Sequence, residues 1–280
     1  MNGGLGLAIQ DGVFAALLSF SSGWLIIAVI FASSRRARAG LLGLFRQIQL
    51  RELPIWMALG GAMGGVLVMS QGLTAGLLGV SLFTVAVVAG QSLSAIAIDA
   101  NGWLGMERRR TSVSRVAGAL IVVLGVGVVA EGFHPQNLAL IALPFAAGLG
   151  LGFQQAANGR IRKAAQSAIA ATFLNFAIGT LVILAVKLAT APVLGFPDAF
   201  PAEWWLYLGG LVGVTFIAVQ VVTVSRIGVL ALGVLLGAGQ LVGSLTIDLM
   251  FPVAGQEFTW PRLIGVLLAL VGATLVNVRR

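Results

Sequence analysis

The 280-residue chain has no cysteine, one histidine and nine acidic residues, and only 9% of its residues are charged. The absence of cysteine excludes a disulfide framework and any thiol-based metal or redox site. One histidine is too few for a zinc site, which uses three or four protein ligands. No phosphate-binding loop pattern occurs, so ATP is not expected as an energy source. The sequence therefore predicts no metal, no cofactor and no catalytic residue, and an enzyme is the least favoured class of function.

Hydrophobic residues make up 59% of the chain, and its mean hydropathy is +1.02, well outside the range of soluble domains. Apolar segments of about 20 residues recur, long enough as helices to cross a hydrocarbon core about 30 Å thick. We therefore expect an all-α, polytopic membrane protein with nine transmembrane helices, at about 8–31, 55–76, 79–100, 113–132, 137–157, 165–189, 204–225, 228–250 and 260–278. An amphipathic helix near 36–50, with several arginines, is expected to lie in the membrane interface.

Basic residues are distributed unevenly between the two sides of the predicted membrane. The chain has 17 Lys and Arg residues and a net charge of +8. If the loop at 32–54 is cytoplasmic, all of them except Lys187 and Arg262 fall on the cytoplasmic side, as the positive-inside rule requires. The C-terminus is then cytoplasmic. The positive charge thus reflects membrane orientation, so the lipid bilayer is the expected partner and nucleic acid is not.

One ten-residue pattern occurs twice, each time in a long apolar segment: Gly90-Gln91 to Ile98-Asp99, and Gly239-Gln240 to Ile247-Asp248. The same offset aligns the two copies without a gap over more than forty residues. Upstream, at a second offset, further positions align, namely Asn2 with Asn158, Gln10 with Gln166, Phe20 with Phe176 and Gly23 with Gly179. Agreement over this length indicates an internal duplication.

Corresponding helices run in opposite directions in the predicted topology, which makes the two copies an inverted repeat. We expect a five-helix unit, with residues 1–133 and 134–280 as its two copies and the first helix of the first copy absent. Either that helix was lost or the chain starts at an internal Met of a longer product, and we expect the second. Inverted repeats are typical of secondary transporters, which bind solute near the midplane. A monomer with an internal pseudo-dimer is the expected assembly.

Several polar side chains fall at mid-depth on different predicted helices, and we take them as candidate substrate-binding residues: Gln91, Gln240, Asn175, Ser94, Ser19 and Trp24. A polar group in hydrocarbon is costly unless it has a partner. These residues could line one cavity for a small-molecule substrate. Alternatively, the amides could hydrogen-bond between helices as structural glue.

Three aspartates near the ends of predicted helices are candidate gating or coupling residues: Asp99, Asp248 and Asp11. Asp99 and Asp248 align in the repeat and lie at opposite membrane faces. They could act as gates, or they could only cap helix ends. The single histidine, His134, lies in a short outer loop, where a surface residue is more common than a ligand or base.

Four motifs carry a resemblance to a known family: Phe153-Gln154-Gln155-Ala156-Ala157-Asn158, the run from Phe173 to Gly179, the repeated Gly-Gln…Ile-Asp, and the run from Asn101 to Arg109. Over nearly its whole length the chain resembles a fused, two-copy member of the YdcZ-like family of the drug/metabolite transporter superfamily. The resemblance implies a multi-pass protein of the bacterial inner membrane that acts as a transporter or exporter, with five helices per copy. It implies no substrate and no set of functional residues.

Relatives in the same superfamily couple export to protons through a glutamate inside the membrane. No glutamate of this chain falls within a predicted span, so the sequence does not support that mechanism. The function we expect is export of a small organic solute by alternating access around a polar cavity between the repeats. The alternative is a membrane scaffold or partner protein that transports nothing.

Overall fold

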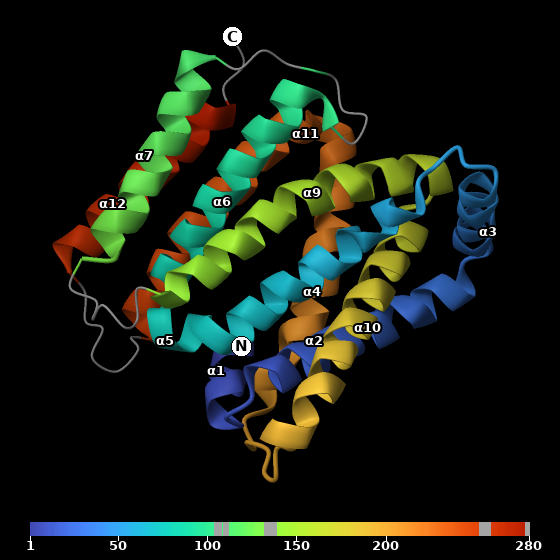
Figure 1. Ribbon diagram of the computed structural model, residues 1–280, viewed down its shortest axis with the longest axis horizontal. Coiled ribbons are helices and arrows are strands. Elements are labelled where there is room, and N and C mark those ends of the chain that lie inside the picture. The colour runs from blue at the N-terminus through green and yellow to red at the C-terminus, as the bar shows by residue number, and fades with distance from the viewer. Residues whose placement is uncertain (104–107, 109–111, 132–138, 252–258, 278–280) are drawn as a thin grey trace. The chain divides into compact units, whose positions relative to one another are not determined.

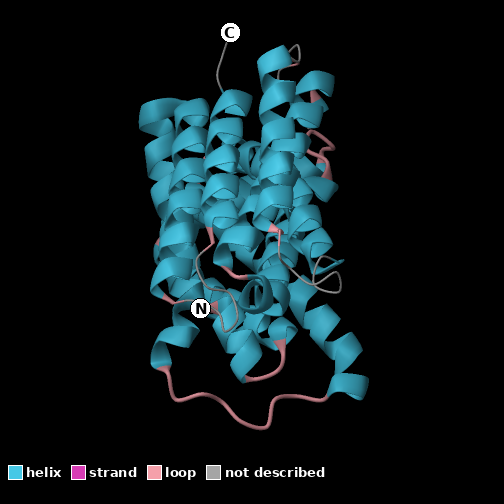
Figure 2. Ribbon diagram, turned by 90° about the vertical axis from the view of Figure 1, so that its left-hand side faces the viewer, coloured by secondary structure: helices cyan, strands magenta, loops and turns pink. Residues whose placement is uncertain are grey.

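The computed structural model describes residues 1–103, 108, 112–131, 139–251 and 259–277, without the side chains of residues 218, 220–234 and 277. In this part of the chain, helices are joined by loops and no strand occurs (Figure 2). The helical elements, labelled in Figure 1, are α1 (Asn2–Ala8), α2 (Gly12–Ser33), α3 (Arg35–Gln49), η1 (Ile55–Leu59), α4 (Gly60–Ser70), η2 (Gln71–Ala75), α5 (Gly76–Leu78), α6 (Val80–Asn101), α7 (Val113–Val129), η4 (Ala139–Ile141), α9 (Ala142–Ala165), α10 (Ala168–Leu194), η5 (Trp204–Leu208), α11 (Gly209–Met250) and α12 (Trp260–Asn277).

Five helical segments are long and apolar enough to cross a membrane: Gly12–Ser33, Ile55–Leu78, Val80–Asn101, Ala139–Ala165 and Ala168–Leu194. Four shorter apolar helical segments coincide with the remaining predicted spans: Val113–Val129, Trp204–Ile217, Leu235–Met250 and Trp260–Val276. The all-α, polytopic class is therefore confirmed. The count of nine spans in an inverted repeat remains a prediction.

Helix α11 differs from the prediction of separate spans at 204–225 and 228–250, because it continues unbroken for 42 residues through Gly228. At a rise of 1.5 Å per residue this is about 63 Å, twice the hydrocarbon thickness. The aligned glycine of the first copy, Gly79, does end a helix, and its φ is 76°. A glycine inside a helix lowers helix stability by only about 1 kcal/mol relative to alanine. Gly228 therefore permits a break in the helix but does not require one.

The described chain forms two compact units, and each takes segments from both predicted repeats. The first unit comprises Met1–Leu73 and Phe153–Val222, and the second comprises Thr74–Gly152 and Thr223–Arg280. The predicted repeats at 1–133 and 134–280 therefore do not coincide with the two compact units.

In the first unit, α2 and α10 cross through residues that the repeat aligns. The rings of Phe20 and Phe176 lie 5.0 Å apart between centroids. A Cβ on Gly23 would lie 2.5 Å from the Phe176 ring, and a Cβ on Gly179 would lie 2.2 Å from the Phe20 ring. Each glycine thus makes room for the aromatic ring of the other copy, and the close approach depends on the missing side chains.

The starts of α2 and α10 also match. Gln10 and Gln166, which the repeat aligns, have positive φ values of 54° and 47°. Each is followed by an N-cap whose side-chain oxygen accepts a hydrogen bond from the backbone N–H three residues on: Asp11 from Phe14, and Ser167 from Ala170. Asp and Ser are both favoured N-caps, so both copies make the same turn with different residues.

In the second unit, α7 and α12 pack through glycines. A Cβ on Gly118 would lie 2.6 Å from the carbonyl oxygen of Gly272, and a Cβ on Gly125 would lie 2.7 Å from that of Gly265. The repeat aligns Gly118 with Gly265 and Gly125 with Gly272. Small residues at such crossings let helix backbones approach closely in a membrane. The core beside this contact is aliphatic and includes Leu82, Val85, Val122, Leu241 and Val266.

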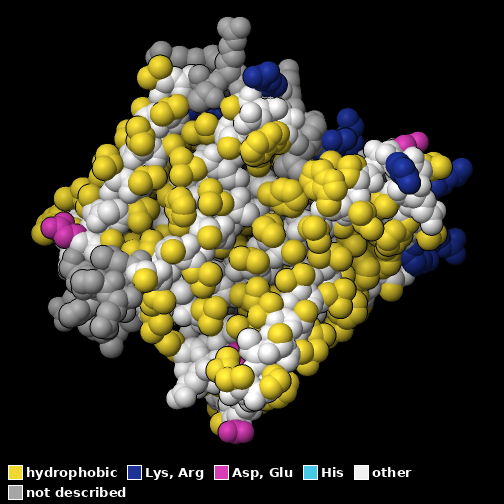
Figure 3. Space-filling view, in the orientation of Figure 1, with side chains coloured by type: hydrophobic (Ala, Val, Ile, Leu, Met, Phe, Trp, Pro, Cys, Tyr) yellow, Lys and Arg dark blue, Asp and Glu magenta, His cyan; other side chains and the backbone are white. Residues whose placement is uncertain are grey.

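Helix α3 confirms that a helix occupies the arginine-rich loop. Ala37 and Leu44 are buried in a cluster that includes Ile161 and Ala165 of α9. Leu42 on another face is 71% exposed. Figure 3 shows Lys and Arg side chains gathered around α3, while hydrophobic side chains cover much of the rest of the visible face. The apolar side of α3 thus packs partly on the protein, and a second apolar edge is left open beside the arginines.

Candidate functional site

Asn175 lies in the middle of α10 at the centre of a hydrogen-bonded amide cluster. Its Oδ1 accepts hydrogen bonds from Gln154 Nε2 and from Asn158 Nδ2, each at 3.0 Å. Asn175 is 3% exposed and Gln154 is 9% exposed. Helix α4 comes close enough that a Cβ on Gly64 would lie 2.5 Å from Gln154 Nε2. This arrangement satisfies the buried acceptor and ties α9 to α10, as interhelical amide glue does.

Ser19 occupies the position that the repeat aligns with Asn175, and it lies in the same unit. It is buried, and a Cβ on Gly209 would lie 2.6 Å from its Oγ and 2.4 Å from Asn2 Oδ1. The aligned contact in the other copy brings Gly60 close to Asn158, where the corresponding distance to Asn158 Oδ1 is 3.2 Å. Aligned positions therefore make similar contacts in this unit.

Trp24 also lies on α2, with its ring 6.1 Å from that of Phe173 between centroids. Its Nε1 is buried and has no hydrogen-bond partner among the described residues. The residue aligned with it, Thr180, likewise has a buried Oγ1 without a described partner. An unpaired buried donor is costly, so these groups are available to a bound solute or to water.

Gln91 and Ser94 lie one helical turn apart on α6, in the second unit, and both are partly exposed. Helix α9 passes beside them, because a Cβ on Gly148 would lie 3.1 Å from Gln91 N, and a Cβ on Gly152 would lie 2.2 Å from Ser94 Oγ. The side chains of Gln91 and Ser94 make no hydrogen bond to any residue that the structure describes. They differ in this from the satisfied amides around Asn175.

Gln240 lies on α11 in the same unit as Gln91, and its side chain is exposed. It too makes no hydrogen bond within the described part of the chain. The structure places Asn175, Ser19 and Trp24 in the first unit and Gln91, Ser94 and Gln240 in the second. The six predicted binding residues thus fall into two groups of three.

The depths of Gln91 and Gln240 can be compared through Asp248, which links their helices. Asp248 accepts hydrogen bonds from the backbone N–H groups of Val80 and Ser81 at the start of α6, each at 2.7 Å. By helical rise, Gln240 lies about 12 Å from Asp248 and Gln91 about 16 Å from Val80. Leu241 shares a core cluster with Ala89. The two glutamines therefore lie at similar depth on neighbouring helices.

The three predicted gating or coupling aspartates all have partners. Asp248 is 4% exposed and caps α6, a helix other than its own. Asp99 instead pairs with Arg115, whose Nη2 lies 2.7 Å from Asp99 Oδ2 and whose Nε donates to the carbonyl of Val276. The two aligned aspartates thus differ in partner, one binding a helix N-terminus and the other an arginine.

Asp11 caps α2 and also pairs with Lys187, a contact that the sequence analysis did not anticipate. Lys187 Nζ lies 2.5 Å from Asp11 Oδ2 and 2.7 Å from the carbonyl oxygen of Gly195. It also lies 4.9 Å from the centre of the Phe196 ring. Lys187 is fully buried, so its charge depends on these partners. A lysine within a predicted apolar span was the signal for such a site.

Gln154 and Asn158 are the other residues that the binding prediction omitted. Both belong to a motif noted in the sequence, and their spacing of four residues places them on one face of α9. The alignment of Asn158 with Asn2 was a further signal. His134 and residues 104–107 and 109 of the family motif lie outside the described residues.

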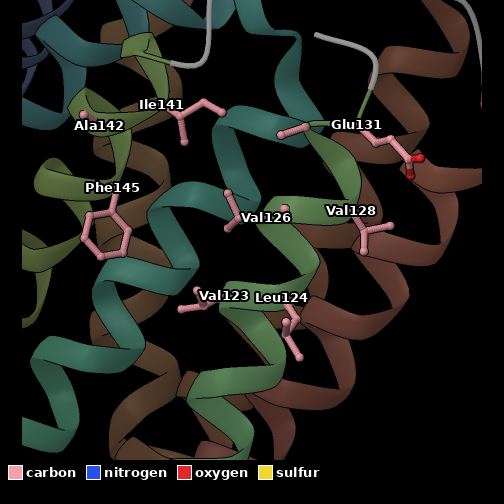
Figure 4. A pocket seen from close by; sticks show the side chains of 10 residues that line it. Val123, Leu124, Val126, Val128, Glu131, Ile141, Ala142 and Phe145 are labelled. Atoms are coloured by element: carbon pink, nitrogen blue, oxygen red, sulfur yellow. The ribbon is translucent and has the colours of Figure 1, made fainter. Parts of the chain in front are cut away.

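A hollow of about 730 Å³ lies in the second unit between α7 and the start of α9. Figure 4 shows Val123, Leu124, Val126, Ile141 and Phe145 among the side chains around it, with the Glu131 carboxylate at its edge. None of the predicted binding residues lines this hollow. Its lining is almost wholly apolar, so it does not offer the hydrogen bonds that a polar solute requires.

The chain is similar to a known family and to a known protein. The model of a family described as "Putative inner membrane exporter, YdcZ" matches residues 1–128 and again residues 139–275. The chain is also similar to the inner membrane protein YdcZ of Escherichia coli (strain K12), with 28% identity over 144 residues. That alignment covers 50% of this chain and 95% of the relative. The relative is thus about the length of one copy, and two successive segments of the chain match the family.

Proposed function

Because the chain belongs to the YdcZ family of inner membrane exporters, we propose that it carries a small organic solute across the inner membrane by alternating access. The description of the family as an exporter supports a transporter rather than an enzyme. The double match to the family supports a fused pair of copies. The matching contacts of aligned residues on α2 and α10, and on α7 and α12, support an inverted repeat.

The observation that carries the proposed solute site is the state of the two repeated glutamines. Gln91 and Gln240 lie in apolar helices at similar depth, and neither side chain has a hydrogen-bond partner within the described chain. An amide left unpaired in hydrocarbon costs about 2–7 kcal/mol. A polar solute, or water when the solute is absent, would remove this cost. We assign Gln91, Gln240 and Ser94 to solute binding.

Within the first unit, Trp24 is a separate candidate for solute binding, through its unpaired buried Nε1. Asn175 and Ser19 are assigned a supporting role, because Asn175 already binds two amides and Ser19 lies in the aligned position. A solute that exchanges hydrogen bonds with amide groups and has an apolar body fits Gln91, Gln240 and Ser94. Organic amides, amines and weakly polar metabolites are the classes to screen first.

Alternating access requires the two copies to exchange conformations, and here they differ. In the first copy a helix ends at Gly79, and the N-terminus of α6 that follows is capped by Asp248 of the second copy. In the second copy Gly228 lies within a continuous helix, and Asp99 of the first copy binds Arg115 instead of a helix N-terminus. We propose that Asp99 and Asp248 are gates whose partners exchange as the transporter changes state, and that Asp11 holds the outer end of α2 through Lys187. The distribution of loop charges supports a cytoplasmic C-terminus.

The test is a thermal-shift screen of the purified protein against amides, amines, guanidinium compounds, sugars and metabolites. A ligand at 100 times its Kd raises the stability of the native state by about 2.7 kcal/mol. We expect a ligand whose shift is lost in the double variant Gln91→Leu/Gln240→Leu but kept in Gln155→Leu, a control at an exposed glutamine of α9. A shift that survives in the double variant would refute the site.

The scaffold alternative rests on the satisfied amide cluster around Asn175. It predicts that Asn175→Leu lowers the midpoint of thermal unfolding and that no compound in the screen shifts the wild-type midpoint. A flat screen, together with a lowered unfolding midpoint of the Gln91→Leu/Gln240→Leu variant, would favour this alternative over transport.

A further inference from the structure

A second hollow, of about 690 Å³, lies in the first unit where α9 ends and α3 and α10 begin. Three basic side chains line it, Arg36 from α3 and Arg162 and Lys163 from the last turn of α9. No acidic residue is among its lining residues. None of the three basic side chains forms an ion pair with any residue that the structure describes. The hollow therefore gathers three positive charges without a counter-ion.

The N-termini of two helices add to this charge. Ser34 and Ser167, the N-caps of α3 and α10, both line the hollow. The first backbone N–H groups of a helix and its dipole favour a nearby anion. Gln166 also lines the hollow, and its side-chain amide is a further donor type available there. Donors of several kinds thus converge on one space.

The basic residues are not required by the fold of the repeat. The turn of α9 that carries Arg162 and Lys163 aligns with the turn of α1 that carries Gly6 and Leu7. Both turns lead into a residue with positive φ and then an N-cap, so the same backbone forms without the charges. Orientation in the membrane would explain basic residues on this side but does not require that they line one hollow.

The surroundings point to the membrane surface as the source of the anion. Helix α3, which contributes Arg36 to the hollow, exposes Leu42 at 71% and Phe45 at 48% farther along its length. An amphipathic helix with arginines and exposed apolar side chains lies in the interface between headgroups and acyl chains. Basic pockets on the cytoplasmic side of membrane helices suit anionic headgroups. The loop charges predict that this side is cytoplasmic.

We propose that this hollow binds a phosphate-bearing anion and that its source is the headgroup of an anionic phospholipid. The phosphodiester accepts hydrogen bonds from Arg36, Arg162 and Lys163 and from the N-terminal N–H groups of α10. Leu42 and Phe45 lie against the acyl chains. This site is separate from the proposed solute site and does not depend on whether the chain transports.

The test compares lipids and a soluble anion on the full chain. The purified protein is delipidated in a neutral detergent and titrated with phosphatidylglycerol, phosphatidylcholine or inorganic phosphate. Retained lipid is counted by native mass spectrometry, and the unfolding midpoint is recorded. We expect phosphatidylglycerol to bind and raise the midpoint, and phosphatidylcholine and millimolar phosphate to do neither. If inorganic phosphate raises the unfolding midpoint and phosphatidylglycerol does not, a lipid headgroup is not the source of the anion.

Two pocket variants and a charge-matched control localise the binding. Arg162→Gln/Lys163→Gln should weaken phosphatidylglycerol binding about tenfold or more, since each basic residue near a membrane surface contributes substantially. Arg36→Gln, on a different helix, should weaken it less and guards against misfolding of the double variant. Arg35→Gln/Arg46→Gln removes two charges from α3 outside the hollow and should bind like wild type. Equal affinity in the pocket and control variants would refute the proposal.

Discussion

Replacing Asp248 with Asn should destabilise the protein far more than the same change at its aligned partner, Asp99. Asp248 is 4% exposed and accepts two backbone hydrogen bonds, at 2.7 Å each, from the first N–H groups of α6. A hydrogen bond to a charged group contributes about 1.5–3 kcal/mol. Asparagine keeps one acceptor but turns an NH₂ group toward the other N–H, and it removes the charge that the helix N-terminus favours. We expect a loss of about 2–4 kcal/mol in unfolding free energy.

Asp99→Asn is the matched control, because its carboxylate is 21% exposed and pairs with an arginine that is 15% exposed. An asparagine at this position keeps an oxygen that can accept the hydrogen bond from Arg115 in this part-buried pair, so we expect a loss of about 1 kcal/mol. The assay is thermal unfolding in detergent, followed by the fluorescence of the six tryptophans. A difference of 2 kcal/mol corresponds to about 4–8 °C in midpoint for a chain of this size. Equal midpoints for the two variants would show that the Asp248 cap does not hold α6.

Two further predictions test the contacts inside each unit. Lys187→Met should lower the unfolding free energy by about 3–5 kcal/mol, because it leaves Asp11 partly buried without its cation. The double variant with Asp11→Asn should lose less unfolding free energy than the sum of the two single changes. Additive losses in this double-mutant cycle would contradict the ion pair. Gly118→Ala should lower the unfolding free energy by about 1–3 kcal/mol, because its Cβ would lie 2.6 and 2.8 Å from backbone atoms of α12. The control is Gly127→Ala on the same helix, whose Cβ would have no neighbour within 4 Å and which should be neutral or stabilising. Detergent unfolding curves measure both glycine variants, and a Gly118→Ala curve that overlays that of Gly127→Ala would rule out the close helix crossing.

Much of the fold followed from hydropathy and the repeat. The apolar segments predicted the long helices, and the arginine-rich loop predicted α3, now placed at Arg35–Gln49. The repeat alignment predicted pairs of residues whose contacts match, such as Phe20 with Phe176. Helix α11 was wrongly predicted as two helices. A glycine that can break a helix looks the same in a sequence as one that stays inside it, and the neighbouring helices decide between them.

The candidate site was only partly accessible from the sequence. Depth in the helix singled out Gln91, Gln240 and Asn175 together, because periodicity gives the position of a residue along the membrane normal but not its partner. The structure separates them: Asn175 is hydrogen-bonded to Gln154 and Asn158, while the two glutamines are unpaired in the described chain. The role of each amide depends on which helix faces it, which local spacing does not encode.

By itself, the sequence determined that this is an all-helical membrane protein of duplicated design, because the length of apolar runs and the agreement between copies are properties of the chain alone. Tertiary structure alone decided which charges meet. Lys187 is 176 residues from Asp11, and Val80 is 168 residues from Asp248. Such pairs form only when packing brings distant helix ends together, and the high cost of an unpaired charge in an apolar interior then fixes each partner.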